Sequence, residues 1–301
     1  MALTSQINNR GSEVDSPQAN KSLNTIWLEV EGLRIRCLTA GADGAPVLLI
    51  HGGGFDSANF SFKYTIEYLA SNHRVFAPDL PGYGESDKPR INYTLDYYVE
   101  FLEHFMEAIG LERISLVGIS LGGAAALGFA LRVPPKVEKL VLVDCYGLGS
   151  KRPFAGIGYV LVHAPGINNL IWALLCRSRR MIRWSLYTVF HNRQVVTKDM
   201  VDEAYSACRR SEAGRAFRSF QRSEVLWGGL HTDFSERLHE VSVPTLIVHG
   251  EHDSAVPVSW ARRAHQHIAG SRLNVLSRCG HASPRECPEE FNRIIGQFLK
   301  Q

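Results

Sequence analysis

The sequence lacks the paired cysteines of a sulfur-ligated metal site or a redox motif. Its six cysteines are scattered along 301 residues without a C-x-x-C pair: Cys37, Cys145, Cys176, Cys208, Cys279 and Cys287. A chain of this length can bury one sizeable core, with room for an inserted subdomain, without a disulfide framework. We therefore expect reduced thiols and a cytoplasmic location.

Long apolar segments are also missing. Residues 1–22 are polar and lack the apolar stretch of a secretory signal, so we interpret them as a flexible tail. Two uncharged runs come closest to a membrane span, Ile114–Leu131 and Pro153–Cys176. The first contains four glycines and is typical of a buried strand followed by a buried helix. The second is interrupted by Pro165 and Gly166, and we expect no transmembrane helix.

A strong charge of one sign is absent as well. The net charge is +3, which is too small to suggest a general nucleic-acid binder. Apolar residues make up 45% of the chain and charged residues 21%, close to the average of globular proteins. These values exclude a disordered, collagenous or coiled-coil chain.

Short apolar runs alternate with helical patterns over most of the sequence. The alternation is regular in residues 23–147 and again in 231–301, whereas residues 148–230 have mostly helical patterns and no clear strand. Strands that alternate with helices predict a parallel sheet covered on both faces. We therefore expect an α/β core formed by 23–147 and 231–301, with 148–230 inserted as a helical cap or lid.

A serine lies at a predicted strand-to-helix turn. Residues Gly118–Gly122 read G-I-S-L-G, a G-x-S-x-G match placed where an apolar strand ends and an Ala- and Gly-rich helix begins. Such a turn strains the backbone of the serine and projects its hydroxyl from the carboxyl edge of the sheet. The position favours Ser120 as a nucleophile over an ordinary Gly/Ser turn.

A histidine-glycine loop follows the predicted strand Pro46–Ile50. The three successive glycines Gly52–Gly54 let the backbone approach a bound group closely. Acyl transfer develops an oxyanion that needs preorganised N–H donors. We expect Leu121 to supply one N–H group and this loop the other, with Gly53 favoured within it. His51 is interpreted as a residue that fixes the loop rather than as a base.

An acid and a base follow the serine in the chain. Asp253 comes just after a late strand, and His281 comes after the last one. In a catalytic triad the serine attacks, the imidazole with its pKa of about 6.5 takes and returns the proton, and the carboxylate fixes the imidazole tautomer. Asp144, at the end of the strand Val137–Asp144, is a rival acid that we expect to be a structural hydrogen-bond acceptor.

Together these motifs resemble the α/β-hydrolase superfamily, in its form with a helical cap. The resemblance covers about residues 24–301, and it includes Ala77–Ser86, which is similar to the family's loop after its fourth strand. It implies a mostly parallel, eight-stranded sheet and no metal or organic cofactor. It also implies that Ser120 is the nucleophile, Asp253 the acid and His281 the base, with oxyanion donors from Leu121 and the Gly52–Gly54 loop.

The resemblance narrows the chemistry. Haloalkane dehalogenases and epoxide hydrolases of this fold use an aspartate nucleophile, which Ser120 argues against. We predict a serine hydrolase that cleaves a carboxylic ester of a hydrophobic acyl or aryl acid. The alternatives are a C–C bond hydrolase of the meta-cleavage type, since the His-Gly-Gly-Gly loop is similar to theirs, and a non-catalytic small-molecule receptor. Those C–C hydrolases usually carry an aromatic residue after the histidine, where this chain has Ala282.

The predicted cap is basic and partly apolar. Thirteen lysines and arginines accompany five acidic residues between positions 150 and 230, a local charge of +8 in a chain whose total is +3. Four of the basic residues follow the uncharged run Pro153–Cys176 directly: Arg177, Arg179, Arg180 and Arg183. This composition suits a lipid-like or anionic substrate, or peripheral contact with an anionic membrane surface, and the alternative is a solvated helical face. Trp172 and Trp184 are candidates to line the substrate pocket.

Overall fold

The computed structural model describes residues 23–151 and 155–301. Residues 1–22, which the sequence analysis interprets as a flexible tail, lie outside the described residues, as do residues 152–154 at the start of the predicted cap.

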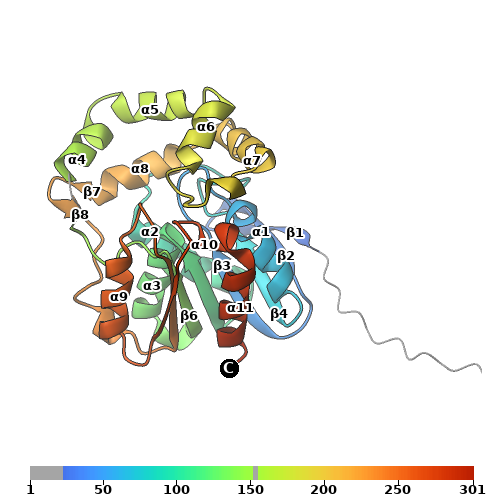
Figure 1. Ribbon diagram of the computed structural model, residues 1–301. Helices are drawn as coiled ribbons and strands as arrows, with labels where there is room; N and C mark the ends of the chain where they lie inside the picture. Colours follow the sequence, from blue (N-terminus) through green and yellow to red (C-terminus); the bar gives the residue numbers. More distant parts are fainter. Residues whose placement is uncertain (1–22, 152–154) are drawn as a thin grey trace, which may run out of the picture.

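A central sheet of eight strands organises the molecule (Figure 1). Its strands are β1 (Asn24–Val30), β2 (Leu33–Ala40), β3 (Ala45–Ile50), β4 (His73–Pro78), β5 (Ile114–Ile119), β6 (Val137–Val143), β9 (Thr245–Gly250) and β10 (Arg272–Leu276). Their order across the sheet is β1-β2-β4-β3-β5-β6-β9-β10. The pairs β1–β2 and β2–β4 are antiparallel, and every later neighbour is parallel. The mostly parallel, eight-stranded sheet of the α/β-hydrolase fold is thereby confirmed.

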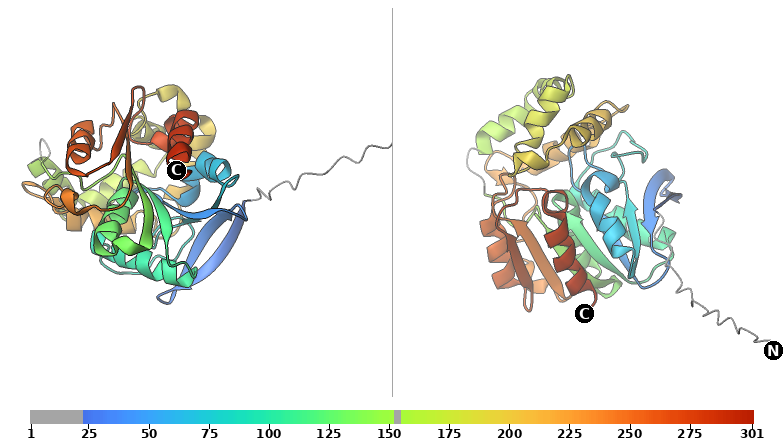
Figure 2. Two further views of the ribbon diagram at one scale, coloured as in Figure 1. Left: turned by 90° about the horizontal axis from the view of Figure 1, so that it is seen from below. Right: turned by 45° about the vertical axis from the view of Figure 1, so that its right-hand side comes forward.

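Helices cover both faces of this sheet (Figure 2). They are α1 (Ala58–Leu69), α2 (Leu95–Ala108), α3 (Leu121–Arg132), α9 (Val258–His267), α10 (Ser283–Glu286) and α11 (Pro288–Leu299), with the 3₁₀ turns η1 (Pro134–Lys136) and η3 (Leu238–Glu240). In β3, Leu48 and Ile50 join the apolar cluster under α2, α3 and α9, whereas Val47 and Leu49 join the cluster under α1 and α11. Burial on both faces explains why this strand is apolar throughout.

The segment between β6 and β9 forms a helical layer at one end of the sheet (Figure 1). Its elements are α4 (Ala155–His163), α5 (Ile167–Leu175), α6 (Arg179–Leu186), η2 (Arg193–Val195), α7 (Lys198–Cys208), α8 (Arg215–Glu224), β7 (Val225–Leu226) and β8 (Gly229–Leu230). An apolar cluster from α6 and α7 packs against Phe60 and Ala282 of the core. The strands β7 and β8 have only two residues each, too few to produce an alternating apolar pattern. No strand was therefore predicted in this segment.

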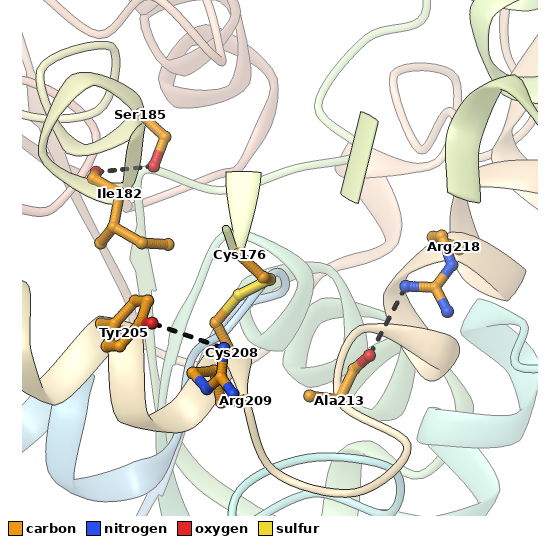
Figure 3. The surroundings of a disulfide bond; sticks show 8 residues. All are labelled: Cys176, Ile182, Ser185, Tyr205, Cys208, Arg209, Ala213 and Arg218. Carbon is orange, nitrogen blue, oxygen red and sulfur yellow. Dashed lines mark hydrogen bonds between the residues drawn. A yellow bond between two sulfur atoms is a disulfide. The ribbon is translucent and has the colours of Figure 1, made fainter. Parts of the chain in front are cut away.

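Two cysteines of this layer correct the expectation of reduced thiols. Cys176, directly after α5, and Cys208, the last residue of α7, form a disulfide with their Cα atoms 5.7 Å apart (Figure 3). They are 32 positions apart in the sequence, and such a pairing depends on the packing of two helices rather than on spacing. The free cysteines are Cys37, Cys145, Cys279 and Cys287.

The two uncharged runs have different structures. Ile114–Leu131 consists of β5 and most of α3, both buried almost throughout, as the sequence predicts. The described part of the second run consists of α4 and α5. No single helix among the described residues is long and apolar enough to cross a membrane, and α4 and α5 meet that criterion only as a pair bent by 88°.

Candidate active site

Ser120 occupies a strained turn between β5 and α3. Its backbone has φ +54° and ψ −117°, in a region that residues other than glycine rarely adopt. A Cβ at Gly118 would lie 2.2 Å from the carbonyl oxygen of Gly122, and a Cβ at Gly122 would lie 2.2 Å from that of Ile50. The flanking glycines are therefore required for strand and helix to approach, as the G-x-S-x-G pattern predicts.

Three loops bring a serine, a histidine and an aspartate into one hydrogen-bonded chain. Ser120 Oγ lies 3.0 Å from His281 Nε2, and His281 Nδ1 lies 2.7 Å from Asp253 Oδ2. The other carboxylate oxygen, Asp253 Oδ1, accepts the N–H groups of Ala255 and Val256 at 2.7 and 2.8 Å. Because an ionised carboxylate only accepts, Nδ1–H donates to Asp253 and Nε2 is free to accept the serine proton.

The electrostatics of the aspartate–histidine pair favour this arrangement. Burial by itself would raise the pKa of Asp253, but hydrogen bonds from His249 and His281 outweigh it and hold that pKa well below its ordinary value. Burial would lower the pKa of His281, yet the hydrogen bond and charge of Asp253, with the charge of Asp144, raise it. The carboxylate thus stays charged, and the imidazolium that forms when the serine loses its proton is stabilised.

His249 is a second histidine beside Asp253, and it was not among the residues predicted from the sequence. Its Nε2 lies 3.3 Å from Asp253 Oδ2 and 3.0 Å from the carbonyl oxygen of Val256, and its side chain is fully buried. Burial would lower the pKa of His249, but the hydrogen bond to Asp253 and the nearby carboxylates raise it. The available signal was its position, as the last residue but one of β9 in the segment that carries Asp253.

Asp144, the rival acid, links the loop after β9, which carries Asp253, to the loop after β10, which carries His281. Its Oδ1 accepts the N–H of Gly250 at 2.8 Å, and its Oδ2 accepts that of Ser283 at 3.1 Å. Burial raises the pKa of Asp144. It makes no described hydrogen bond to His281, and its contacts are those of the structural acceptor that we expected.

Asp144, His249 and Asp253 place three possible metal-ligand atoms within 4.8 Å of one another. Both oxygens of each carboxylate already accept hydrogen bonds from described residues. A cation at this place would displace the contacts that hold the triad. We therefore assign the cluster to the acid end of the triad and not to a metal site.

The glycine loop corrects one predicted oxyanion donor. The N–H of Gly52 donates to Asp56 Oδ2 at 2.8 Å, so it is not free to bind a substrate oxygen. The same carboxylate also accepts the Ser61 hydroxyl at 2.7 Å. His51 Nε2 accepts the N–H of Leu80 at 2.9 Å, which fixes the base of the loop as predicted.

Gly53 and Leu121 stay available as oxyanion donors. Both residues line the same cavity as Ser120. Leu121 is the first residue of α3, where a backbone N–H has no acceptor within the helix. No described residue accepts a hydrogen bond from either N–H group. Gly54, with φ +87°, supplies the turn after them.

A mostly apolar cavity of about 430 Å³ lies between the core and the helical layer, with Ser120 and His281 in its wall. Seven aromatic side chains contribute to its lining: Phe55, Phe60, Tyr146, Trp172, Phe190, Phe217 and Phe220. Trp172 is thus placed as predicted, but Trp184 is not, because its side chain is 62% exposed on α6. The buried residues of α6 are Ile182 and Leu186, and a position two residues from each points away from their face.

Part of the cavity wall is polar, which no sequence pattern indicated. Glu224 is almost fully buried there, and its Oε2 accepts the Tyr146 hydroxyl at 2.8 Å and the N–H of Thr232 at 3.0 Å. Asn168 and Gln221, also in the wall, are hydrogen-bonded to each other at 3.3 Å. Glu224 forms no salt bridge with a described residue, and Arg285, which also lines the cavity, is paired instead with Glu203 at 3.4 Å.

Comparisons with known proteins identify the family of this chain. A family model described as the alpha/beta hydrolase family matches residues 47–294. The 2-hydroxy-6-oxo-2,4-heptadienoate hydrolase of Pseudomonas putida is 30% identical over 259 residues, 85% of this chain and 89% of that protein. The 2-hydroxy-6-oxo-6-(2'-aminophenyl)hexa-2,4-dienoic acid hydrolase of Metapseudomonas resinovorans is 31% identical over 282 residues, 91% and 90% of the two chains.

A solved structure of a related hydrolase has the same fold. A variant of the meta-cleavage product hydrolase of Pseudomonas fluorescens superposes with a TM-score of 0.77 at 29% identity, covering 91% of this chain and 97% of that one. The relatives' names support hydrolysis, and they name 2-hydroxy-6-oxo-dienoates as substrates rather than the esters that were predicted first. The chain belongs to the alpha/beta hydrolase family and is a hydrolase.

Proposed function

We propose that this protein is a serine hydrolase that cleaves the C–C bond beside a ketone carbonyl in a 2-hydroxy-6-oxo-dienoate. The observation that carries the proposal is the 3.0 Å contact between Ser120 Oγ and His281 Nε2 at the wall of a mostly apolar cavity. The substrate class comes from the relatives, which are named as hydrolases of such dienoates.

The contacts suggest an order of steps. Ser120 Oγ adds to the ketone carbonyl while its proton passes to His281 Nε2, and the N–H groups of Gly53 and Leu121 stabilise the oxyanion. Cleavage requires the substrate in its 2-oxo tautomer, in which the 2-hydroxyl proton has been lost and a proton gained at C5. The bond between C5 and C6 then breaks, its electron pair moves into the conjugated 2-oxo group, and the enolate oxygen takes the proton from His281. Water, activated by the same imidazole, releases the acid from Ser120.

The test is turnover of synthetic dienoates. The purified protein is mixed with a 6-methyl and a 6-phenyl 2-hydroxy-6-oxo-dienoate, and loss of the conjugated chromophore and formation of acetate or benzoate are measured together. We expect stoichiometric acid release by the natural protein and none by Ser120→Ala. Absence of turnover by the natural protein on both substrates would remove this substrate class.

Ester hydrolysis is a second candidate, and two observations favour it. The buried carboxylate of Glu224 lies in the cavity wall without a described cationic partner, which disfavours an anionic dienoate and tolerates a neutral ester. Ala282 follows His281, where the C–C hydrolases usually carry an aromatic residue. A panel of p-nitrophenyl esters from short to long acyl chains, assayed beside the dienoates, ranks the two activities by kcat/KM.

A further inference from the structure

The outer surface of the helical layer is unusually apolar. Of the sixteen large hydrophobic side chains that are exposed among the described residues, eleven belong to this layer: Ile157, Val160, Leu161, Ile167, Leu170, Ile171, Leu174, Met181, Trp184, Leu226 and Trp227. Ile171 also lines the cavity. We call the other ten residues the outer cap face. Soluble monomers rarely expose contiguous apolar surface of this kind unless it binds something.

Helices α4 and α5 form the centre of the outer cap face. In α5, Trp172 and Leu175 line the cavity, while Leu170 and Leu174 point outward and are 59% and 45% exposed. In α4 only Val162 is buried. A surface helix normally has a polar outer side, so helices that are apolar on the outside as well indicate an apolar environment there. Both lie at the end of the molecule farthest from the C-terminus (Figure 1).

The hairpin β7–β8 extends the outer cap face beside α4. The rings of Trp227 and Tyr159 are 5.8 Å apart, and a Cβ at Gly156 would lie 3.5 Å from Trp227. Trp227 packs against α4 on one side and is nonetheless 67% exposed. Exposed tryptophans, here Trp184 and Trp227, are the residues that prefer the interface between water and lipid headgroups.

Basic side chains lie next to this apolar surface. Arg177 lies two residues before the start of α6, and Arg180 is the second residue of this helix. Both are exposed and form no salt bridge with a described residue, whereas Arg179 is paired with Asp202. The segment 150–230 as a whole carries a formal charge of +8. Such charge is complementary to anionic lipid, and two copies of this face would instead repel each other.

We propose that the outer cap face docks on the surface of an anionic phospholipid bilayer. Leu170, Leu174 and the two exposed tryptophans would enter the headgroup region, with Arg177 and Arg180 on lipid phosphates. Helices α4 and α5 lie in the plane of the interface, since neither is long enough to span the bilayer. This proposal does not depend on which bond the active site cleaves.

Vesicle binding of the full chain tests the proposal. The protein is sedimented with vesicles of phosphatidylcholine alone and of phosphatidylcholine with about one third phosphatidylglycerol, at low and at physiological salt. We expect binding to the anionic vesicles that weakens as salt rises. Leu170→Glu/Leu174→Glu and Arg177→Gln/Arg180→Gln should each weaken it about tenfold or more. Absence of binding to anionic vesicles at low salt would overturn the proposal.

Matched controls separate docking from general stickiness and from self-association. Ile91→Glu changes an exposed apolar residue outside the helical layer and should leave vesicle binding unchanged. Because Leu170 and Leu174 do not line the cavity, their double variant should keep the natural melting temperature and its turnover of soluble substrate. Equal loss of binding in Ile91→Glu, or a lipid-free dimer that Leu170→Glu/Leu174→Glu abolishes, would contradict a membrane partner.

Discussion

At the scale of single residues, two buried aspartates near His281 have different tasks. Asp253 accepts a hydrogen bond from the imidazole at 2.7 Å, whereas Asp144 accepts only backbone N–H groups from the two loops. We predict that Asp253→Asn lowers kcat by about 10⁴-fold, because the wrong imidazole tautomer is then favoured. Asp144→Asn should cost less activity and more stability. Steady-state kinetics and melting curves of the two variants check this, and the reverse ranking of activity would make Asp144 the acid.

Protonation of His281 should determine how the reaction rate falls at low pH. Neutral imidazole is needed as the base, so activity is lost when His281 binds a proton. Since the pKa of His281 is raised, protonation begins at a higher pH than the ordinary value of about 6.5. We expect kcat/KM to fall with one proton as the pH drops through that raised pKa, while Asp253, with its lowered pKa, stays charged. A profile that stays flat down to about pH 4.5, roughly two units below the ordinary imidazole pKa, excludes a histidine base.

Glu224 should discriminate between anionic and neutral substrates. Its carboxylate lies in the cavity wall, so a negative charge on the substrate is repelled there. We predict that Glu224→Gln raises kcat/KM for a dienoate relative to a neutral ester by roughly tenfold, the size of a partly screened like-charge contact. Tyr146→Phe is the matched control, because it removes the hydrogen bond at 2.8 Å and keeps the charge. If both variants change the ratio equally, Glu224 acts through packing and not through its charge.

Within the helical layer, α5 and α6 carry the two tryptophans that were predicted to line the substrate pocket, and only one of them does. Trp172 lines the cavity, with its ring 6.5 Å from that of Phe217, whereas Trp184 is exposed. We predict that Trp172→Ala shifts the preferred acyl length or aryl size of the substrate and that Trp184→Ala leaves this preference unchanged. A panel of esters and dienoates of increasing size measures it. An unchanged ranking in Trp172→Ala would show that this ring does not touch the substrate.

The core elements could be predicted because their signals are local. The alternation of short apolar strands with helices, and the glycines around Ser120, each depend on a few neighbouring residues, and the sheet and the strained turn follow from them. The order of serine, acid and base added a chain-level signal, and the three side chains do meet.

What could not be predicted depends on contacts between distant elements. The N–H of Gly52 is occupied because Asp56 folds back on the loop, and a glycine run does not reveal which amide is free. The Cys176–Cys208 disulfide and the outward side chain of Trp184 depend on how α5, α6 and α7 pack together. Glu224 is one acidic residue in a basic segment, and only the fold places it in the cavity wall.

At the scale of the whole molecule, the core supplies the reacting groups and the helical layer supplies much of the chamber. Ser120, Asp253 and His281 come from loops at the carboxyl ends of three strands, the edge at which open α/β sheets bind ligands. The layer closes the cavity with its inner side and presents the outer cap face to its surroundings. Reaction and proposed membrane docking thus use opposite sides of the same helices.

The geometry supports one direct assignment, that Ser120 is a nucleophile activated by His281 and Asp253. Labelling with a fluorophosphonate tests it without knowledge of the substrate, because the probe bonds covalently to an activated serine. Intact mass and peptide mapping should show one adduct on Ser120, a labelling rate that falls as His281 becomes protonated, and no adduct in Ser120→Ala. An adduct on another residue, or equal labelling of Ser120→Ala, would contradict the assignment.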